Sequence, residues 1–296
     1  MTALGPDSIS ACLVAHNEEA VVARCLRSLE GVVDEIVVAH PGRCEDRTLE
    51  IARFYGARVL ECPPGHSERH TPFVYEQARG AWVLSIDADE WLGGEARAAL
   101  RSLVRTGAAD GYAFVWPLWH RGRELTSRGP HKLTLMRRSK LRMVGVMHRG
   151  ETIDGVVRRV PLRLEHRPRY GEFSLAKVRG KMLPRAAQQA AEYLSDADEL
   201  PRFGYPAGHA RWSRRRRFVN RHAAALVVPT TLHAFVHVLR LHRDRMPLGV
   251  LVRFAAFRAL YRGIVTFEIA REVRRRRGAP GPRRRASSAR PWGSRA

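Results

Sequence analysis

The chain has 296 residues, 45% of them hydrophobic, which is the composition of a globular protein and excludes a disordered chain. At this length it can bury a sizeable core in one large domain or two small ones. Its formal net charge of +23 favours nucleic acid, anionic lipid or polyanionic substrates as partners.

The four cysteines, at positions 12, 25, 44 and 62, show no C-x-x-C pair and no zinc-type histidine spacing. We interpret them as reduced thiols. Because no basic region followed by a long apolar run opens the chain, no signal peptide is predicted. We therefore expect a protein of the cytosol.

The first 115 residues alternate short β-rich runs with amphipathic helical patterns, which predicts a parallel sheet flanked by helices. Strands are expected at 9–15, 34–39, 57–62 and 82–86. Helices are expected at 18–31, at 46–55 with Asp46 as its cap, and at 73–79 after Pro72.

Polar residues follow three of these strands where each strand ends. His16, Asn17 and Glu18 follow the first, His40 ends the second, and Asp87 and Asp89 follow the fourth. The carboxyl ends of parallel strands meet at one edge of a sheet, and ligands bind in the crevice there. The pattern therefore predicts a binding site at this edge.

The stretch WVLSIDADEW, residues 82–91, places Asp87, Asp89 and Glu90 within four positions at the end of an apolar strand. Repulsion and partial desolvation oppose ionisation of all three unless a positive group lies nearby. A hard divalent cation would relieve the repulsion and could also hold a ligand's phosphates. The alternative is a solvated loop whose acids cap the next helix.

From 111 to about 166 the pattern changes to β-rich pieces with turn residues between them, which predicts a mixed sheet extension that covers the crevice. A helix is expected over 172–194, and 195–217 is polar and typical of a linker. Arg137, Arg138, Lys140 and Arg142 in the extension form either a basic binding patch or a solvated strand face.

Two apolar stretches follow, at 223–239 and 248–267. We expect Pro229 to interrupt the first, which at 17 residues falls short of the ~20 that a membrane span needs. The second carries three arginines, each costly at a bilayer centre. The pattern favours a helix pair in the interface of an anionic membrane, with a helix pair packed on the α/β domain as the alternative.

Several blocks of the N-terminal half resemble the nucleotide-binding half of family 2 glycosyltransferases of the GT-A fold. They are ISACLVAHNEEAVVARCLRSLEGVVDEIVVA, Asp46-Arg47-Thr48 and EQARGAWVLSIDADEWL. Within that family the chain is most similar to bacterial lipopolysaccharide-core and cell-envelope enzymes. We expect a GT-A domain at 8–180, a helix and basic linker at 181–217, a membrane-associated helical pair at 218–273 and a disordered Arg-rich tail at 274–296.

The resemblance implies an inverting, hexosyltransferase-type transfer of a sugar from a nucleotide diphosphate donor to a hydroxyl of a lipid-linked or envelope glycan acceptor. It implies nucleotide contacts from Ala15, Asn17, Glu18, His40, Asp46 and Asp87, and a Mg²⁺ or Mn²⁺ ion at Asp87 and Asp89. Such an enzyme would work peripherally at the inner face of the cell membrane.

The chain departs from the family pattern at several positions. His40 stands where an Asp is usual, Thr71-Pro72 where an Arg-Asn pair is common, and His148-Arg149 where a His-Glu pair is common. Glu151 or His148 is the candidate catalytic base, although His148 could equally have a structural role. His166, near a strand end, is interpreted as structural.

These departures support a second hypothesis, a GT-A domain that binds a nucleotide or a partner without turnover. A third is a nucleic-acid binder drawn by the +23 charge. Because the sequence contains no RNP box or zinc-finger motif, no specific nucleic-acid partner is predicted.

Overall fold

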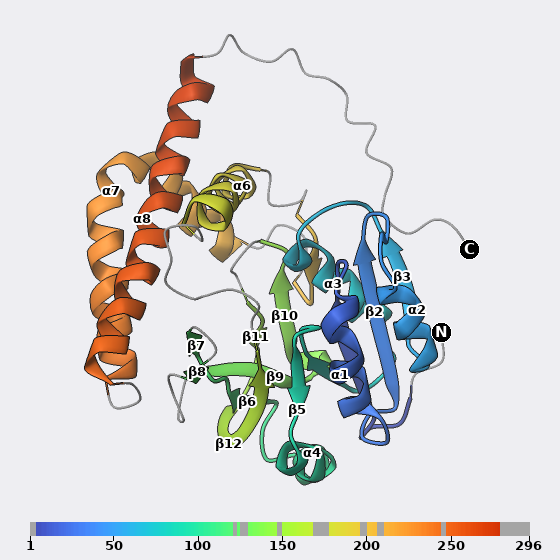
Figure 1. Ribbon diagram of the computed structural model, residues 1–296. Coiled ribbons are helices and arrows are strands. Elements are labelled where there is room, and N and C mark those ends of the chain that lie inside the picture. Colours follow the sequence, from blue (N-terminus) through green and yellow to red (C-terminus); the bar gives the residue numbers. More distant parts are fainter. Residues whose placement is uncertain are drawn as a thin grey trace.

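The computed structural model describes residues 4–120, 123–124, 130–146, 150–167, 178–195, 200–205, 210–243 and 247–278. Its centre is an eight-stranded sheet with the strand order β3-β2-β1-β4-β9-β6-β12-β5. Helices pack on the sheet, and three C-terminal helices lie to one side of it (Figure 1). This arrangement confirms the predicted α/β class.

The N-terminal half of the sheet is parallel, as predicted. Its strands are β1 (Ile9–Val14), β2 (Glu35–Pro41), β3 (Arg58–Cys62) and β4 (Trp82–Ser85). All three pairings among them are parallel. The connecting helices are α1 (Glu19–Leu29), α2 (Thr48–Phe54) and α3 (Ser67–Gln77). The loops that follow β1, β2 and β4 therefore meet at one edge of the sheet.

The other half is the expected mixed extension. Strand β9 (His131–Arg137) pairs antiparallel with both β4 and β6 (Gly111–Val115). Beyond β6 lie β12 (Val157–His166), which is parallel to it, and β5 (Glu90–Leu92), which is antiparallel to β12. Helix α4 (Gly94–Thr106) ends at Gly107, whose φ of 58° is the left-handed conformation typical of a helix C-terminus.

Short elements complete this half of the molecule. Strands β10 (Leu141–Val144), β11 (Thr152–Ile153) and β13 (Arg202–Phe203) form a three-stranded sheet, and β7 (Trp119–His120) pairs with β8 (Arg123–Glu124). A 3₁₀ turn spans Arg138–Lys140 and a π turn spans Val178–Met182.

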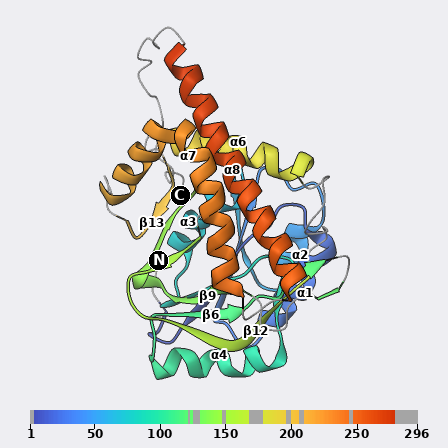
Figure 2. The ribbon, with the colours of Figure 1, turned by 90° about the vertical axis from the view of Figure 1, so that its left-hand side faces the viewer.

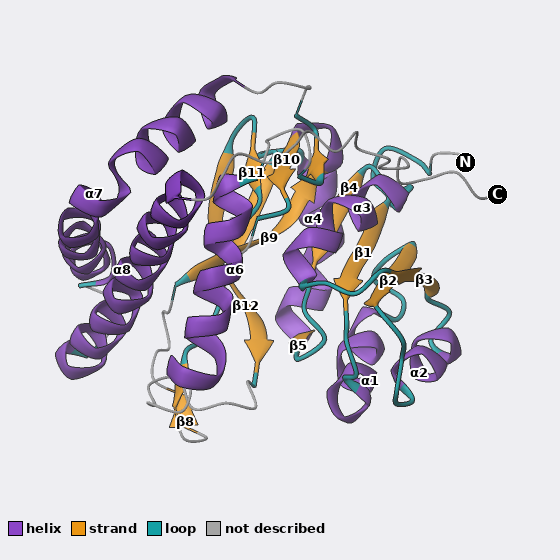
Figure 3. Ribbon diagram, turned by 90° about the horizontal axis from the view of Figure 1, so that it is seen from above, coloured by secondary structure: helices purple, strands orange, loops and turns teal. Residues whose placement is uncertain are grey.

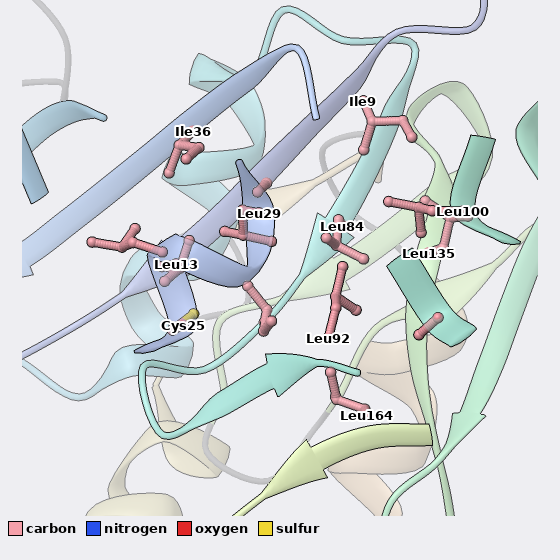
Figure 4. Packing of buried hydrophobic residues seen from close by; sticks show 14 of the residues in the cluster. Ile9, Leu13, Cys25, Leu29, Ile36, Leu84, Leu92, Leu100, Leu135 and Leu164 are labelled. Atoms are coloured by element: carbon pink, nitrogen blue, oxygen red, sulfur yellow. The ribbon is translucent and has the colours of Figure 1, made fainter. Parts of the chain in front are cut away.

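The core lies on both faces of the sheet because side chains along a strand alternate. Ile9 and Leu13 of β1 face the cluster under α1 and α4, where Leu29 and Leu100 are buried (Figure 4). Cys12 points the other way, into a second cluster that α3 covers. All four cysteines are unpaired, as predicted.

Helix α3 begins earlier than the sequence suggested. We expected a start at Phe73, but the helix begins at Ser67 and contains Pro72. Pro72 lacks an N–H for the carbonyl of Glu68. Gly145 packs against that carbonyl, and a Cβ on Gly145 would lie only 3.0 Å from its oxygen.

The C-terminal region contains α6 (Leu183–Leu194), α7 (Ala210–His242) and α8 (Leu248–Gly278). Helices α7 and α8 lie side by side, with α7 outermost (Figures 2 and 3). Small residues allow this approach: Gly263 faces Thr231, and the hydroxyls of Thr230 and Thr266 are 3.1 Å apart. Such packing by small residues and threonine hydroxyls is common between helices in membranes.

The expectation that Pro229 interrupts the first apolar stretch was wrong, since α7 runs through it. Two threonine hydroxyls bond carbonyls near the proline: Thr230 Oγ1 donates to Leu226 O at 2.6 Å and Thr231 Oγ1 to Val227 O at 2.7 Å. The carbonyl that lacks a helical donor because of Pro229 is that of Ala225, so these two bonds lie beside it in the same turn. Within the described chain, one helix segment, Arg217–His242, is long and apolar enough to cross a membrane, and 6% of its most apolar window is buried.

Candidate active site

The loop after β1 is held by the loop after β2. Ala15 is buried and its N–H donates to Ala39 O at 2.9 Å, which extends the sheet by one residue. Asn17 then adopts a left-handed φ of 52°, and its Oδ1 accepts the N–H of Glu45 at 3.0 Å. Asparagine tolerates that conformation better than most residues. Ala15, Asn17 and Glu18 thus lie in the loop where nucleotide contacts were expected.

His40 is fully buried beneath this loop. The N–H of Asn17 donates to its Nε2 at 3.3 Å, so Nδ1 carries the proton and donates to Gly42 O at 3.0 Å. The ring also stacks on His16, with 5.2 Å between centroids. His40 therefore supports the loop, and its contact with a nucleotide stays a prediction.

Asp46 joins the N-termini of two helices. Its Oδ2 accepts the N–H of Glu19 in α1 at 3.0 Å, and its Oδ1 accepts the N–H of Thr48 in α2 at 2.9 Å. Partial burial works against the charged form, but the hydrogen bonds from Thr48 and Glu19 outweigh it and lower the pKa of Asp46 to about 2. Asp46 therefore lies one residue before Arg47, the N-cap of α2, and accepts the first N–H of that helix, while nucleotide binding by Asp46 stays a prediction.

A lysine lies among the three crowded acids. The Lys132 ammonium donates to Asp87 Oδ2 at 2.8 Å, and to the two Glu90 oxygens at 2.8 and 2.7 Å. Glu90 is buried and also accepts the N–H of Asp87 and the indole N–H of Trp116, each at 2.8 Å. The positive group that the crowding required is therefore supplied, at least in part, by the chain itself.

Burial acts on both members of the Lys132–Glu90 pair. Burial by itself lowers the pKa of Lys132, but the nearby Asp87 and Glu90 carboxylates outweigh that effect and raise the pKa above its usual value. Three donors, the Asp87 N–H, the Trp116 indole and the Lys132 ammonium, make four hydrogen bonds to the two Glu90 oxygens, while burial raises the pKa of Glu90 to about 7 against the attraction of Lys132. Glu90 is therefore paired with Lys132, and Asp87 shares the same counter-charge.

Asp89 pairs with His166. His166 Nε2 lies 3.4 Å from Asp89 Oδ2, and the buried ring stacks on Trp116 with 4.5 Å between centroids. Burial raises the pKa of Asp89, but the His166 contact and the charge of Lys132 outweigh it and lower the pKa below its usual value. Strand β12 pairs with β5 in a register that sets His166 opposite Glu90, which brings it to the acidic loop.

The donor set at this edge fits a hard divalent cation. The carboxylates of Asp87 and Asp89 are 63% and 31% exposed, so their oxygens remain accessible. No group of three potential ligands gathers among the described residues. Mg²⁺ commonly takes only one or two carboxylates together with substrate phosphates, so two aspartates are enough. Asp87 lines the pocket described below and Asp89 does not, so metal binding by the two aspartates stays a prediction.

A pocket of about 270 Å³ opens beside Asp87 and Lys132. Glu151, a candidate base, lines it, and its carboxylate accepts hydrogen bonds from the hydroxyls of Tyr75 and Ser85. Burial raises the pKa of Tyr75 well above its usual value, so the phenol keeps its proton and donates. The remaining lining residues are Cys12, Leu13, Val14, Glu68, Thr71, Val74, Ile86, Met143, Gly150 and Arg258. His148, the other candidate base, lies outside the described residues.

Residues 10–156 match the family model described as Glycosyl transferase family 2. The chain belongs to glycosyltransferase family 2. An uncharacterized glycosyltransferase of Rickettsia typhi is 32% identical over 104 residues, which are 35% of each chain. The low-salt glycan biosynthesis hexosyltransferase Agl6 of Haloferax volcanii is 32% identical over 110 residues, 35% of this chain and 26% of that one. The match thus spans about a third of the length of such relatives.

Two solved structures are similar to this family 2 glycosyltransferase. Glucosyl-3-phosphoglycerate synthase from Mycobacterium tuberculosis, in complex with Mn²⁺, UDP and glucosyl-3-phosphoglycerate, is 19% identical with a TM-score of 0.43, and 67% of this chain and 87% of that chain are covered. Staphylococcus aureus TarS 1–349 with UDP-GlcNAc is 14% identical with a TM-score of 0.42, covering 90% and 92%. The parallel half and mixed extension form the GT-A fold that the sequence predicted.

Three side chains of the site were missed or misjudged from sequence. Lys132 was not singled out, although the antiparallel register of β4 and β9 pairs Leu84 with Leu135 and, continued for three residues, sets Lys132 opposite Asp87. Tyr75 was not singled out either. Arg258 counted only as an arginine within an apolar helix, since nothing local to it points toward the pocket.

Proposed function

We propose that this glycosyltransferase moves a hexosyl group, with inversion, from a nucleoside diphosphate sugar to a hydroxyl of a lipid-linked or envelope glycan acceptor. The observation that carries the proposal is the shared pocket, in which Glu151 faces the same space as Asp87 and Lys132. Displacement of a diphosphate requires a base that deprotonates the acceptor and a group that stabilises the charge on the leaving diphosphate. The pocket brings candidates for both tasks together.

In this mechanism Glu151 removes the proton from the acceptor hydroxyl as its oxygen attacks the sugar. The hydroxyls of Tyr75 and Ser85 hold the Glu151 carboxylate at one oxygen, which fixes the base in the pocket. Lys132 stabilises the negative charge that develops on the leaving diphosphate. A Mg²⁺ or Mn²⁺ ion held by Asp87 and Asp89 would, when bound, add Lewis-acid stabilisation to the same oxygens.

The test uses Glu151→Gln, with Glu61→Gln as the matched control because Glu61 is 70% exposed and pairs only loosely with Arg53 at 3.7 Å. Sugar transfer and donor hydrolysis are measured across UDP- and GDP-sugars with Mn²⁺. General-base catalysis contributes roughly 10²- to 10⁴-fold, so Glu151→Gln should lose at least 100-fold while nucleotide affinity is kept. Unchanged activity in Glu151→Gln would exclude Glu151 as the base.

The metal role has its own test. Calorimetry of UDP and GDP binding with and without Mn²⁺ should show metal-dependent affinity in the wild type. We expect Asp89→Ala to remove that dependence and to abolish donor hydrolysis. A substitution at Glu90 would not test the metal role in the same way, because the Glu90 carboxylate is buried against Lys132. Metal-dependent binding that persists in Asp89→Ala would contradict the assignment.

A second candidate function is nucleotide or partner binding without turnover. It is favoured by the pairing of both metal-site aspartates with protein groups, Asp87 with Lys132 and Asp89 with His166. Nucleotide binding without hydrolysis of any tested donor, in the wild type, would support this candidate over transfer.

We further propose that α7 and α8 associate with an anionic membrane at its cytoplasmic face. Apolar side chains on α7 are exposed, Val228 by 64% and Leu232 by 60%, and arginines flank them. The unpaired cysteines favour a reducing compartment. Full-length protein should float with anionic liposomes, and a Val228→Asp, Leu232→Asp double variant should not. Equal flotation of the two proteins would refute the anchor.

A further inference from the structure

The pocket beside Asp87 is closed in part by the C-terminal region. Most of its described lining comes from the family 2 domain, but Arg258 belongs to α8. Figure 2 shows α8 running alongside α7 and past the sheet. The helix therefore contributes a side chain to the candidate active site in addition to any contact it makes with a membrane.

Buried neighbours fix the position of Arg258 on α8. Ala255, three residues earlier, is fully buried and belongs to a cluster with Leu118 of the family 2 domain. Ala259, the next residue, is 5% exposed. Three residues later the Tyr261 hydroxyl donates to Gln189 Oε1 of α6 at 3.0 Å. The backbone that carries Arg258 is thus packed on both sides, and its exposed side chain lines the pocket.

The pocket's acids are already engaged by other groups. Asp87 pairs with Lys132, Glu151 accepts the Tyr75 and Ser85 hydroxyls, and Glu68 lies 3.2 Å from His66 Nδ1. No carboxylate in the described part of the chain lies within ion-pair distance of the Arg258 guanidinium. The pocket therefore presents a permanent cation that lacks an anionic partner among the described residues.

We propose that Arg258 binds a phosphate group of a substrate, which makes α8 a wall of the transfer site. The inference rests on the proposed transferase function, because it assigns the phosphate to a substrate of that pocket. A guanidinium presents a planar fork of donors that matches phosphate oxygens two at a time. The phosphate comes either from the diphosphate of the donor or from a phosphate carried by the acceptor.

The first arm of the experiment tests the donor. Binding of inorganic pyrophosphate, UDP and GDP to full-length wild type, Arg258→Ala and Arg258→Lys is measured by calorimetry with Mn²⁺. Loss of one charge-assisted phosphate contact should weaken binding about 10- to 100-fold. Arg258→Lys should fall between wild type and Arg258→Ala, since it keeps the charge but loses the planar fork.

The second arm tests the acceptor. Inorganic phosphate is titrated into protein saturated with the nucleotide that binds best. If the acceptor supplies the phosphate, Arg258→Ala keeps pyrophosphate affinity but loses at least 10-fold in this second titration. Either result supports the inference and identifies the source of the phosphate.

Arg253→Ala is the matched control. Arg253 is also exposed on α8, but it does not line the pocket, and five residues turn a helix by about 140° away from Arg258. The inference would be overturned if wild type and Arg258→Ala bound with equal affinity in both arms, or if Arg253→Ala lost as much affinity as Arg258→Ala. It would also be overturned if the wild type bound neither pyrophosphate nor phosphate. Arg258-dependent binding without sugar transfer from any donor would instead reject only the proposed transferase function.

Discussion

The Lys132 ammonium lies 2.8 Å from Asp87 Oδ2 and 2.7 Å from Glu90 Oε2, so a single side chain of β9 neutralises two acids from the β4–β5 segment. The Glu90 side chain is fully buried, whereas 63% of the Asp87 side chain is exposed. Lys132 therefore stabilises the buried Glu90 carboxylate, and most of the Asp87 side chain stays accessible to a ligand.

Lys132→Met should destabilise the fold strongly. Removal of one partner of a buried ion pair leaves an uncompensated charge and costs about 3 kcal/mol or more. Urea unfolding measures the loss, with Lys140→Met as a control at an exposed lysine of the same region. Addition of Glu90→Gln to Lys132→Met should recover part of it. A loss no greater than that of Lys140→Met would show that Glu90 does not depend on this lysine.

Asp46→Ala should lower the free energy of unfolding by about 1–2 kcal/mol, because Asp46 accepts backbone N–H groups from the starts of both α1 and α2. Its lowered pKa, about 2, means that this contribution is present above the ordinary value near 3.8 and is lost as pH falls through about 2. Acid titration of stability checks the sign. Weakened UDP or GDP binding at unchanged stability would instead assign Asp46 to the nucleotide.

The contact between α3 and α6 should weaken in alkaline solution. Burial opposes the charged form of His66, but hydrogen bonds to Glu192 and Glu68 outweigh it and raise the pKa of His66 from 6.5 to about 9. A raised histidine pKa contributes stability that is complete below pH 6.5 and is lost as pH rises through about 9. We expect a loss of roughly 1–3 kcal/mol over that window.

Thermal unfolding of wild type and His66→Gln between pH 6 and 10 provides the measurement. The glutamine keeps a polar side chain but does not titrate, so its stability should vary less across the same window. Parallel pH profiles for the two proteins would contradict the assignment of this transition to His66.

Tyr75→Phe should slow transfer by about 10-fold without a comparable change in the donor KM. The phenol holds the Glu151 carboxylate, so its loss leaves the base present but less well oriented. Steady-state kinetics separate the two parameters. Because Tyr75 is fully buried, a melting curve must accompany the rates. A rise in KM with unchanged kcat would mean that Tyr75 contributes to donor binding rather than to positioning of Glu151.

The parallel half of the sheet was predictable because its signals are local. Ile9, Leu13 and their neighbours alternate with the strand period, and the polar residues after β1, β2 and β4 gather at one edge as topology requires. The mixed extension was recognised as a class, since its β-rich pieces are short and separated by turns. Its strand order requires long-range pairing that periodicity does not encode.

Only the part of the site whose residues are close in the sequence was predicted. Crowding of Asp87, Asp89 and Glu90 correctly indicated a nearby positive charge, but Lys132 lies more than forty residues away and reaches them only through the β4–β9 register. Pro229 misled because it was expected to interrupt the apolar stretch, whereas α7 runs through it, and α3 likewise contains Pro72. The position of Arg258 at the pocket depends on how α8 packs against the family 2 domain, and no local sequence pattern predicts that packing.

The placement of Lys132 also limits how this protein can be recombined. Asp87 and Glu90 belong to the β4–β5 segment, and their shared cation belongs to β9, more than forty residues further along the chain. Consider a chimera that exchanges β9 for that of a relative without a cation at the position of Lys132. Its Glu90 carboxylate would be buried without a counter-charge. Domain swaps designed to alter specificity must therefore carry β4, β5 and β9 together.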